Sequence, residues 1–262
     1  MRKIGTCVAL FGALLVISYA VSAPASAATT EEVLAKLAKQ HGEVKTFECD
    51  MKSIMKEPGQ EGEMVGHMAM EVIVKDGKPA GMKMNMKHTM TPKEGQASAM
   101  LVVNDGQFLW IETKEPESGQ VIVMKQKGDS AQGKMNNPNE FADMFDLKLV
   151  GEEVFDAQTC WVLEGTPKAK PKTPPTGAMM MEPPTPGKVR MYVGQKDTLC
   201  HRYIMYNRAG KEVVDTQLSN LKVNGKLDPA LFRYTPPPGA QVMDMSKGMP
   251  SIDDLKKMIP QD

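Results

Sequence analysis

Alternation of apolar and polar side chains at every second position most constrains what this chain can fold into. In residues 82–90, "MKMNMKHTM", methionines occupy positions 82, 84, 86 and 90. Residues 64–74 show the same pattern, and "KDGKP" between the two segments is typical of a turn. Because successive side chains of a strand point to opposite faces of a sheet, the pattern predicts two neighbouring strands with a shared methionine face.

Further strand-like segments follow at short intervals. "VKTFECDMKSIM" comes before the methionine strands, and "AMLVVNDGQFLWIET" contains an Asn-Asp-Gly turn typical of a hairpin. Strands are also expected in "VIVMKQK", "QTCWVLEG", "KVRMYVG", "LCHRYIMYN" and "EVVDTQLSNLKV". The sum is one antiparallel sheet of roughly ten strands, and a sheet of that size curls or closes.

Short helices are expected beside this sheet. Residues 29–42 have a capping box formed by Thr29 and Glu32, and Gly42 is the expected helix end. Apolar residues at helical spacing also indicate short helices in residues 137–146 and 251–259. Helices this few cannot cover both faces of the sheet, which suggests a strongly curved sheet whose concave side they partly plug.

Methionine replaces the aromatic residues that usually fill a core. The chain has 23 Met against 7 Phe, 5 Tyr and 2 Trp. Methionine is unbranched and polarizable, so this excess favours an apolar surface that adapts to differently shaped partners. The formal net charge is +0 and no long basic run follows the first three residues, which argues against a nucleic-acid-binding protein.

The N-terminus reads as an export signal. Arg2 and Lys3 precede an apolar run over residues 8–21, and "APASA" then supplies the small residues of a cleavage site. We expect residues 1–27 to be a signal peptide that is cleaved after Ala27. The apolar run is short for a membrane span of about 20 residues.

Three cysteines remain after cleavage, so at most one intramolecular disulfide can form. Cys160 and Cys200 lie in strand-like segments on either side of a Pro-rich stretch, residues 166–187, and are the candidate pair. The alternative is that both are small buried thiols.

No catalytic motif is recognisable. The four histidines have no metal-ligand spacing, and neither G-x-S-x-G nor a P-loop occurs. The sequence therefore predicts no enzyme, no metal and no cofactor.

Several segments match motifs of one known protein family. Residues 100–123, "MLVVNDGQFLWIETKEPESGQVIV", resemble the family's DGK-x-LW hairpin. Residues 226–244, "KLDPALFRYTPPPGAQVMD", resemble its C-terminal F-x-F-x-PP-x-G segment, and "WVLEGTPK" is similar to a strand that ends in L-x-PK. The chain thus resembles the LolA family of bacterial periplasmic lipoprotein carriers over nearly all of residues 29–245.

The resemblance implies a fold and a function. The fold is mainly β: an incomplete, strongly curved antiparallel β-barrel (LolA-like) over residues 28–245, with short α-helices lidding an apolar cavity. The Pro-rich stretch at 166–187 is a flexible insertion, and residues 246–262 form a tail. The cavity would carry the acyl chains of lipoproteins from the inner to the outer membrane. A monomer in the periplasm would meet three partners: lipoproteins, an inner-membrane lipoprotein-extraction ABC transporter and an outer-membrane lipoprotein acceptor.

The resemblance also suggests site residues. Apolar side chains of the predicted strands are the candidates for the lipid-binding cavity: Phe47, Met51, Met68, Met70, Val72, Met82, Met84, Met86, Leu101, Val103, Leu109 and Ile111. In the family an arginine before a proline holds the lid, and Lys78 stands at the aligned position here. Lysine lacks the planar fork of arginine, so a lid held by Lys78 would be held less tightly.

Other interpretations of the methionines remain open. They can simply be the apolar half of a half-buried sheet. The same fold can also serve an envelope sensor or regulatory domain that detects lipids or lipoproteins. Thioethers are soft ligands for Cu(I), and His67 and His88 are near in sequence, but alternate strand residues stand about 6.6 Å apart.

Overall fold

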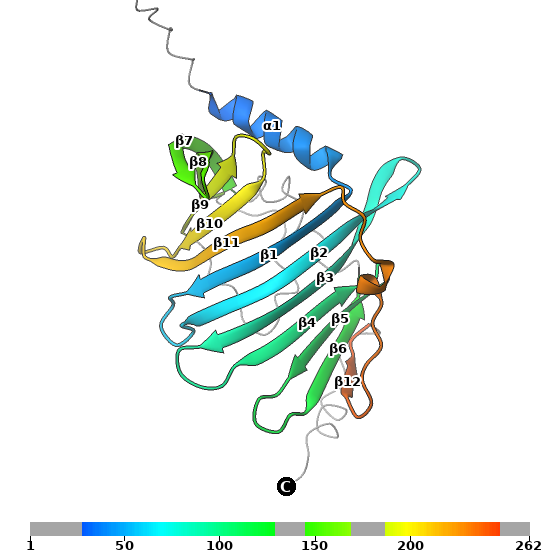
Figure 1. Cartoon of the computed structure of the whole chain (residues 1–262). Coiled ribbons are helices and arrows are strands. Elements are labelled where there is room, and N and C mark those ends of the chain that lie inside the picture. The colour runs from blue at the N-terminus through cyan, green and yellow to red at the C-terminus, as the bar shows by residue number, and fades with distance from the viewer. Residues whose placement is uncertain (1–27, 129–144, 169–186, 247–262) are drawn as a thin grey trace, which may run out of the picture.

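The computed structural model describes residues 28–128, 145–168 and 187–246. Within these ranges the chain forms a single 12-stranded sheet in the order β12-β6-β5-β4-β3-β2-β1-β11-β10-β9-β8-β7 (Figure 1). The first and last strands in this order do not pair, so the sheet is open.

Successive hairpins build one half of the sheet. Its strands are β1 (Thr46–Met55), β2 (Gly62–Lys75), β3 (Lys78–Pro92), β4 (Ser98–Asn104), β5 (Phe108–Lys114) and β6 (Val121–Lys127). Each pairs antiparallel with its neighbour in sequence. The predicted turns are confirmed: Asp76 and Gly77 have positive φ between β2 and β3, and Gly106 has φ 92° between β4 and β5.

A second run of hairpins builds the other half. Its strands are β7 (Phe145–Phe155), β8 (Gln158–Pro167), β9 (Lys188–Gly194), β10 (Cys200–Tyr206) and β11 (Glu212–Val223). β11 pairs antiparallel with β1 and joins the two halves. The Pro-rich stretch at 166–187 begins inside β8, where Thr166 and Pro167 pair with β7, so its predicted start is wrong by two residues. Residues 169–186 lie outside the described residues.

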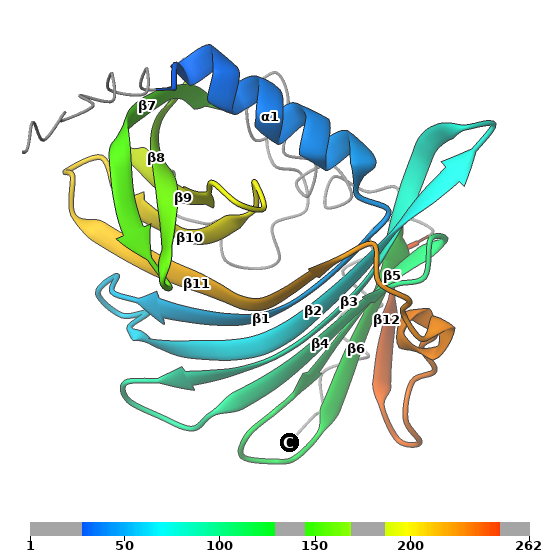
Figure 2. The same cartoon turned by 45° about the horizontal axis from the view of Figure 1, so that its top comes forward.

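The sheet curls strongly, as Figure 2 shows, and confirms the predicted fold class of an incomplete, strongly curved barrel. One pairing differs from the expected antiparallel pattern. The short β12 (Gln241–Asp244) lies parallel to β6 at the edge of the sheet. A 3₁₀ turn, η1 (Pro229–Phe232), precedes it.

Helix α1 (Thr30–Glu43) crosses the open side of the curl (Figure 2). The predicted capping box is confirmed, because Glu32 N–H donates to the Thr29 hydroxyl and Thr29 N–H donates to the Glu32 carboxylate. The predicted end at Gly42 is wrong by one residue. Gly42 lies inside the helix, and the chain leaves it at Val44, whose extended backbone leads into β1.

α1 defines the concave face of the sheet. Its buried Val33 packs with Trp161 and Leu163 of β8 and Val193 of β9. Leu34 and Leu37 add to this cluster. We call this half, β7–β11 with α1, the helix-covered half.

Register shows that the methionines of β2 and β3 share that concave face. Side chains of directly paired residues lie on the same side of a sheet. The pairs run without a break from Leu163 to the methionine strands: Leu163–Met191, Met191–Tyr203, Tyr203–Thr216, Thr216–Ser53, Ser53–Met64 and Met64–Met90. The Ser53 and Thr216 hydroxyls are 2.8 Å apart, as this placement requires.

The segment after β11 covers part of the opposite, convex face. Asn85 Nδ2 donates to the Leu231 carbonyl at 2.8 Å, and the Tyr234 hydroxyl donates to Glu112 at 2.6 Å. Trp110 packs against Tyr234 with ring centroids 5.4 Å apart. Both faces of β4 are buried, because Val102 and Val103 lie on opposite faces and are each 1% exposed.

β7 is a strand that the sequence did not predict. Phe145 and Asp146, which were expected to end a helix, begin this strand. The rest of that predicted helix, the export signal and the predicted C-terminal helix lie outside the described residues. The described helix α1 has 14 residues, and the described part of the chain contains no helix long and apolar enough to cross a membrane.

Candidate functional site: the methionine face

The concave side of β1–β6 forms a methionine-rich surface, which we call the methionine face. Cross-strand pairs on it include Met68–Met86, Met70–Met84, Val72–Met82 and Met64–Met90. The pairs Met86–Val102, Val102–Ile111 and Ile111–Met124 continue it across β4, β5 and β6. The predicted methionine face of β2 and β3 is thus confirmed, and it is wider than the sequence suggested.

Part of this face is a packed core. Met84, Val102, Leu109 and Ile111 are buried, and Met70, Met86, Met100 and Met124 pack against them while staying partly buried. Met84 is 7% exposed. The cluster shows that these methionines contact one another and their aliphatic neighbours, leaving several thioethers at the surface of the described structure.

Most of the predicted cavity residues share the methionine face. Register places ten of the twelve there: Phe47, Met51, Met68, Met70, Val72, Met82, Met84, Met86, Leu109 and Ile111. Whether they contact an acyl chain stays a prediction.

Leu101 and Val103 are on the opposite face. They pair with Lys87 and Asn85 of β3, whereas Val102 pairs with Met86. The expectation that they share a surface with the methionines is wrong. "MLVV" is a continuous apolar run because the C-terminal segment covers the convex side of β4, so alternation could not choose the inward side.

His88 also lies on the methionine face, where the sequence analysis did not place a site residue. It pairs with Gly66 of β2 and Met100 of β4. Its side chain is only 9% exposed, and burial lowers its pKa below the ordinary value, so the imidazole is neutral at pH 7. The sequence could have indicated this placement, because His88 is two positions from both Met86 and Met90 and so shares their face of the strand.

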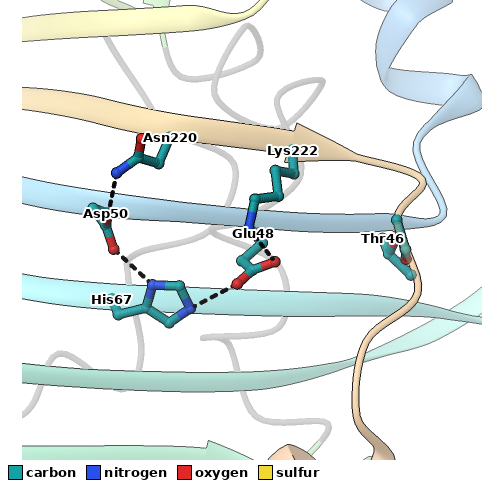
Figure 3. A network of polar contacts seen from close by, with 7 residues as sticks. Thr46, Glu48, Asp50, His67, Asn220 and Lys222 are labelled. Atoms are coloured by element: carbon teal, nitrogen blue, oxygen red, sulfur yellow. Dashed lines mark hydrogen bonds and ion pairs between the residues drawn. The ribbon is translucent and has the colours of Figure 1, made fainter.

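His67 lies on the convex face, because it alternates with Gly66 and Met68, which lie on the methionine face. Its Nδ1 is 2.7 Å from Asp50 Oδ1 and its Nε2 is 3.3 Å from Glu48 Oε1. Figure 3 shows the imidazole between these carboxylates, with Asn220 donating to Asp50 and Lys222 beside Glu48. Each ring nitrogen of His67 therefore has a carboxylate partner.

The candidate disulfide is absent from the structure. Cys160 and Cys200 are free thiols on β8 and β10, and β9 lies between these strands. Strands that are next but one to each other are about 9.5 Å apart, whereas a disulfide needs Cα atoms within roughly 4.4–6.8 Å. Burial raises the pKa of Cys200 to about 12, as it does for Cys49 of the methionine face, so both stay protonated thiols.

Lys78 has no bond to the helix that would hold it as a lid in the described part of the chain. It stands exposed at the turn between β2 and β3, paired with Lys75 across the hairpin. Among the described residues no hydrogen bond or ion pair joins it to α1. The lid-holding role suggested for Lys78 remains a prediction without a supporting contact.

Hollows occur at other places on the described structure. One, of about 480 Å³, lies at the far ends of β1 and β2 and is lined mainly by charged residues, among them Lys56, Glu61 and Lys93. The other, of about 240 Å³, lies between Leu34 of α1 and Leu147 of β7. Within the described ranges, no group of three or more His, Cys, Asp or Glu side chains could hold a metal ion.

Comparisons with known proteins give relatives of low identity. No protein-family model matches the chain. The uncharacterized protein MJ0687 of Methanocaldococcus jannaschii is 25% identical over 166 residues, which are 60% of this chain and 42% of that protein. The chain thus spans less than half the length of this curated relative.

Solved structures with a similar outline include LprF from Mycobacterium bovis, with TM-score 0.46, 12% identity, and coverage of 76% of this chain and 96% of LprF. MucB in the Pseudomonas aeruginosa MucA/MucB complex has TM-score 0.40 and 14% identity, covering 78% of this chain and 60% of that one. The LolA superfamily protein NE2245 from Nitrosomonas europaea has TM-score 0.31 and 16% identity, covering 79% and 99%. The structural neighbours of this chain therefore include a LolA superfamily protein.

Proposed function

We propose that this protein is a periplasmic carrier that holds the acyl chains of lipoproteins against its methionine face, without covalent chemistry. The main support for the proposal is that one end of the concave surface is covered by a helix and the other end has partly buried methionines. α1 covers the β8–β9 end, while partly buried methionines line the β2–β6 end. The resemblance of residues 29–245 to lipoprotein carriers supports the same function.

The chemistry of the surface suits such a cargo. Each CH₂ group removed from water contributes about 0.8 kcal/mol, so an acyl chain needs an apolar surface to cross an aqueous compartment. Flexible thioether side chains can repack around chains of different length and leave them again. A carrier must do both, because it takes cargo from one membrane and releases it at another.

The cellular route is part of the proposal. The export signal would be cleaved after Ala27, an inner-membrane lipoprotein-extraction transporter would deliver the cargo, and an outer-membrane acceptor would take it.

The test is transfer of a lipoprotein from inner-membrane vesicles into solution. We expect the purified mature protein to form a soluble complex with one triacylated lipoprotein, measured after the vesicles are sedimented. The same lipoprotein without its acyl chains should not be bound. If acylated and unacylated forms bind equally, the protein recognises the polypeptide, as a sensor would, and the carrier function is wrong.

A matched pair of variants locates the contact. Met68 and His67 are neighbours on β2 that lie on opposite faces. Met68→Gln places an amide on the methionine face and should weaken complex formation, whereas His67→Gln should leave it unchanged. Circular dichroism checks that both variants fold.

A further inference from the structure

On the methionine face, the described part of the structure holds a buried imidazole, His88, with one unpartnered ring nitrogen. His88 is 9% exposed, and its Nδ1 has no hydrogen-bond partner among the described residues. A buried polar atom without a partner has lost its hydrogen bonds to water and gained none in return, so the ring nitrogen calls for a ligand. No acyl chain can satisfy a ring nitrogen, and the carrier function therefore leaves this group unexplained.

Methionines surround His88 on the same face. Met100 is its direct partner on β4, and paired side chains on one face have Cβ atoms about 4.5–5.5 Å apart. Register places four more methionines within one diagonal or two positions along the strand: Met64, Met68, Met86 and Met90. Their side chains have three rotatable bonds, so two or three sulfurs can turn toward one imidazole.

Gly66 makes this arrangement possible. It is the direct partner of His88 on β2, and a Cβ there would lie 2.6 Å from the His88 Cβ. A side chain at position 66 would compete with the imidazole for the same space. The glycine leaves room between the Met64 and Met68 side chains that flank it.

The side chains around His88 determine which kind of metal ion could bind there. One neutral imidazole with several thioethers is a soft set, whereas Ca²⁺ and Mg²⁺ prefer oxygen ligands. Glu48 and Asp50 of the neighbouring β1 contact His67 on the convex face instead. We propose that His88, Met100 and one or two of the neighbouring methionines form a Cu(I) site on the methionine face.

Cu(I) titration tests the site. The lipid-free mature protein is titrated anaerobically with Cu(I) against a competing chelator of known affinity, so the result does not depend on acyl binding. We expect one equivalent to bind tightly. Loss of a ligand should weaken binding by at least the roughly 10–100-fold seen for outer-shell partners, so His88→Ala and Met100→Leu should both show a fall of that size.

His67→Ala is the matched control, since His67 is a histidine of the adjacent strand on the opposite face. It should bind Cu(I) as the native protein does. X-ray absorption of the loaded protein should show sulfur ligands with one nitrogen, and the nitrogen should be absent in His88→Ala.

Met100→Leu conserves volume, so it keeps the test valid if His88→Ala fails to fold. Unchanged affinity in His88→Ala or Met100→Leu would overturn the proposal, as would failure of the native protein to compete with the chelator. Tight binding that survives these changes would belong to methionines elsewhere in the chain.

Discussion

The two halves of the concave face are built differently. In the helix-covered half, Val33 of α1 packs against Trp161, Leu163 and Val193. All four residues are nearly or fully buried. On the methionine face, Met84 is buried but its methionine neighbours Met70, Met86, Met100 and Met124 are only partly so. One sheet therefore combines a tightly packed core with a softer apolar surface.

The difference teaches where rigidity and adaptability lie. Branched and aromatic side chains have few rotamers and specify one packing, whereas methionine fills irregular gaps and repacks. We infer that the helix-covered half supplies most of the stability and that the methionine face can tolerate rearrangement.

The largest expected effect is loss of a large side chain under α1. Leu163 is 0% exposed, so Leu163→Ala should lower the free energy of unfolding by about 2–5 kcal/mol, because a cavity forms in a rigid cluster. Met70→Ala, a comparable truncation on the methionine face, should cost less because Met70 is partly buried and its neighbours can collapse. Urea unfolding measures both, and equal losses would refute the contrast between the two halves.

A second effect concerns the backbone of the methionine face. An alanine Cβ at position 66 would lie 2.7 Å from the Lys87 carbonyl oxygen and 3.0 Å from the His88 Cα. Because these are backbone atoms of β3, side-chain flexibility cannot relieve the clash, and Gly66→Ala should cost about 1–3 kcal/mol.

Gly81→Ala is its control on β3, where the nearest atom to a new Cβ is 3.6 Å away on the Ile73 side chain. That variant should unfold at nearly the same urea concentration as the native protein. If Gly66→Ala is equally harmless, β2 and β3 separate easily and the whole methionine face is softer than we infer.

The sequence predicted the strands of this face well, because strict alternation and the Asp76-Gly77 turn determine both strand type and register. It failed where both faces of a strand are covered, as at Leu101 and Val103. Contacts between segments far apart in sequence, such as Tyr234 with Glu112, decide that coverage, and no local pattern reports them.

β7 was missed for a related reason. "FDLKLVGEEVF" begins directly after a segment with helical spacing and contains an irregularity between Leu149 and Gly151 that breaks its alternation. The buried, unpartnered Nδ1 of His88 could not be predicted from the sequence either, because its burial depends on the strands on either side of β3.

A smaller effect tests the helix boundary. Thr29→Ala removes the N-cap of α1 and should cost about 1 kcal/mol. The loss should appear as faster amide hydrogen exchange in α1, with the strands of the methionine face unaffected. Lys39→Ala, at an exposed position of the same helix, should change stability by less than about 0.5 kcal/mol. If exchange accelerates on the methionine face as well, the two halves unfold together.

The dependence of binding on acyl-chain length separates a packed core from an adaptable surface. Met68 and Met86 are direct partners, and replacing both with leucine conserves volume, so the change in stability should stay below about 1.5 kcal/mol for each. Branched leucine repacks less freely than methionine. Affinity should therefore change more sharply with acyl-chain length in the double variant, as measured with fluorescent acyl probes.

Met191→Leu, in the helix-covered half, is the control and should leave the length dependence unchanged. An unaltered length dependence in the double variant would mean that Met68 and Met86 only pack against their neighbours.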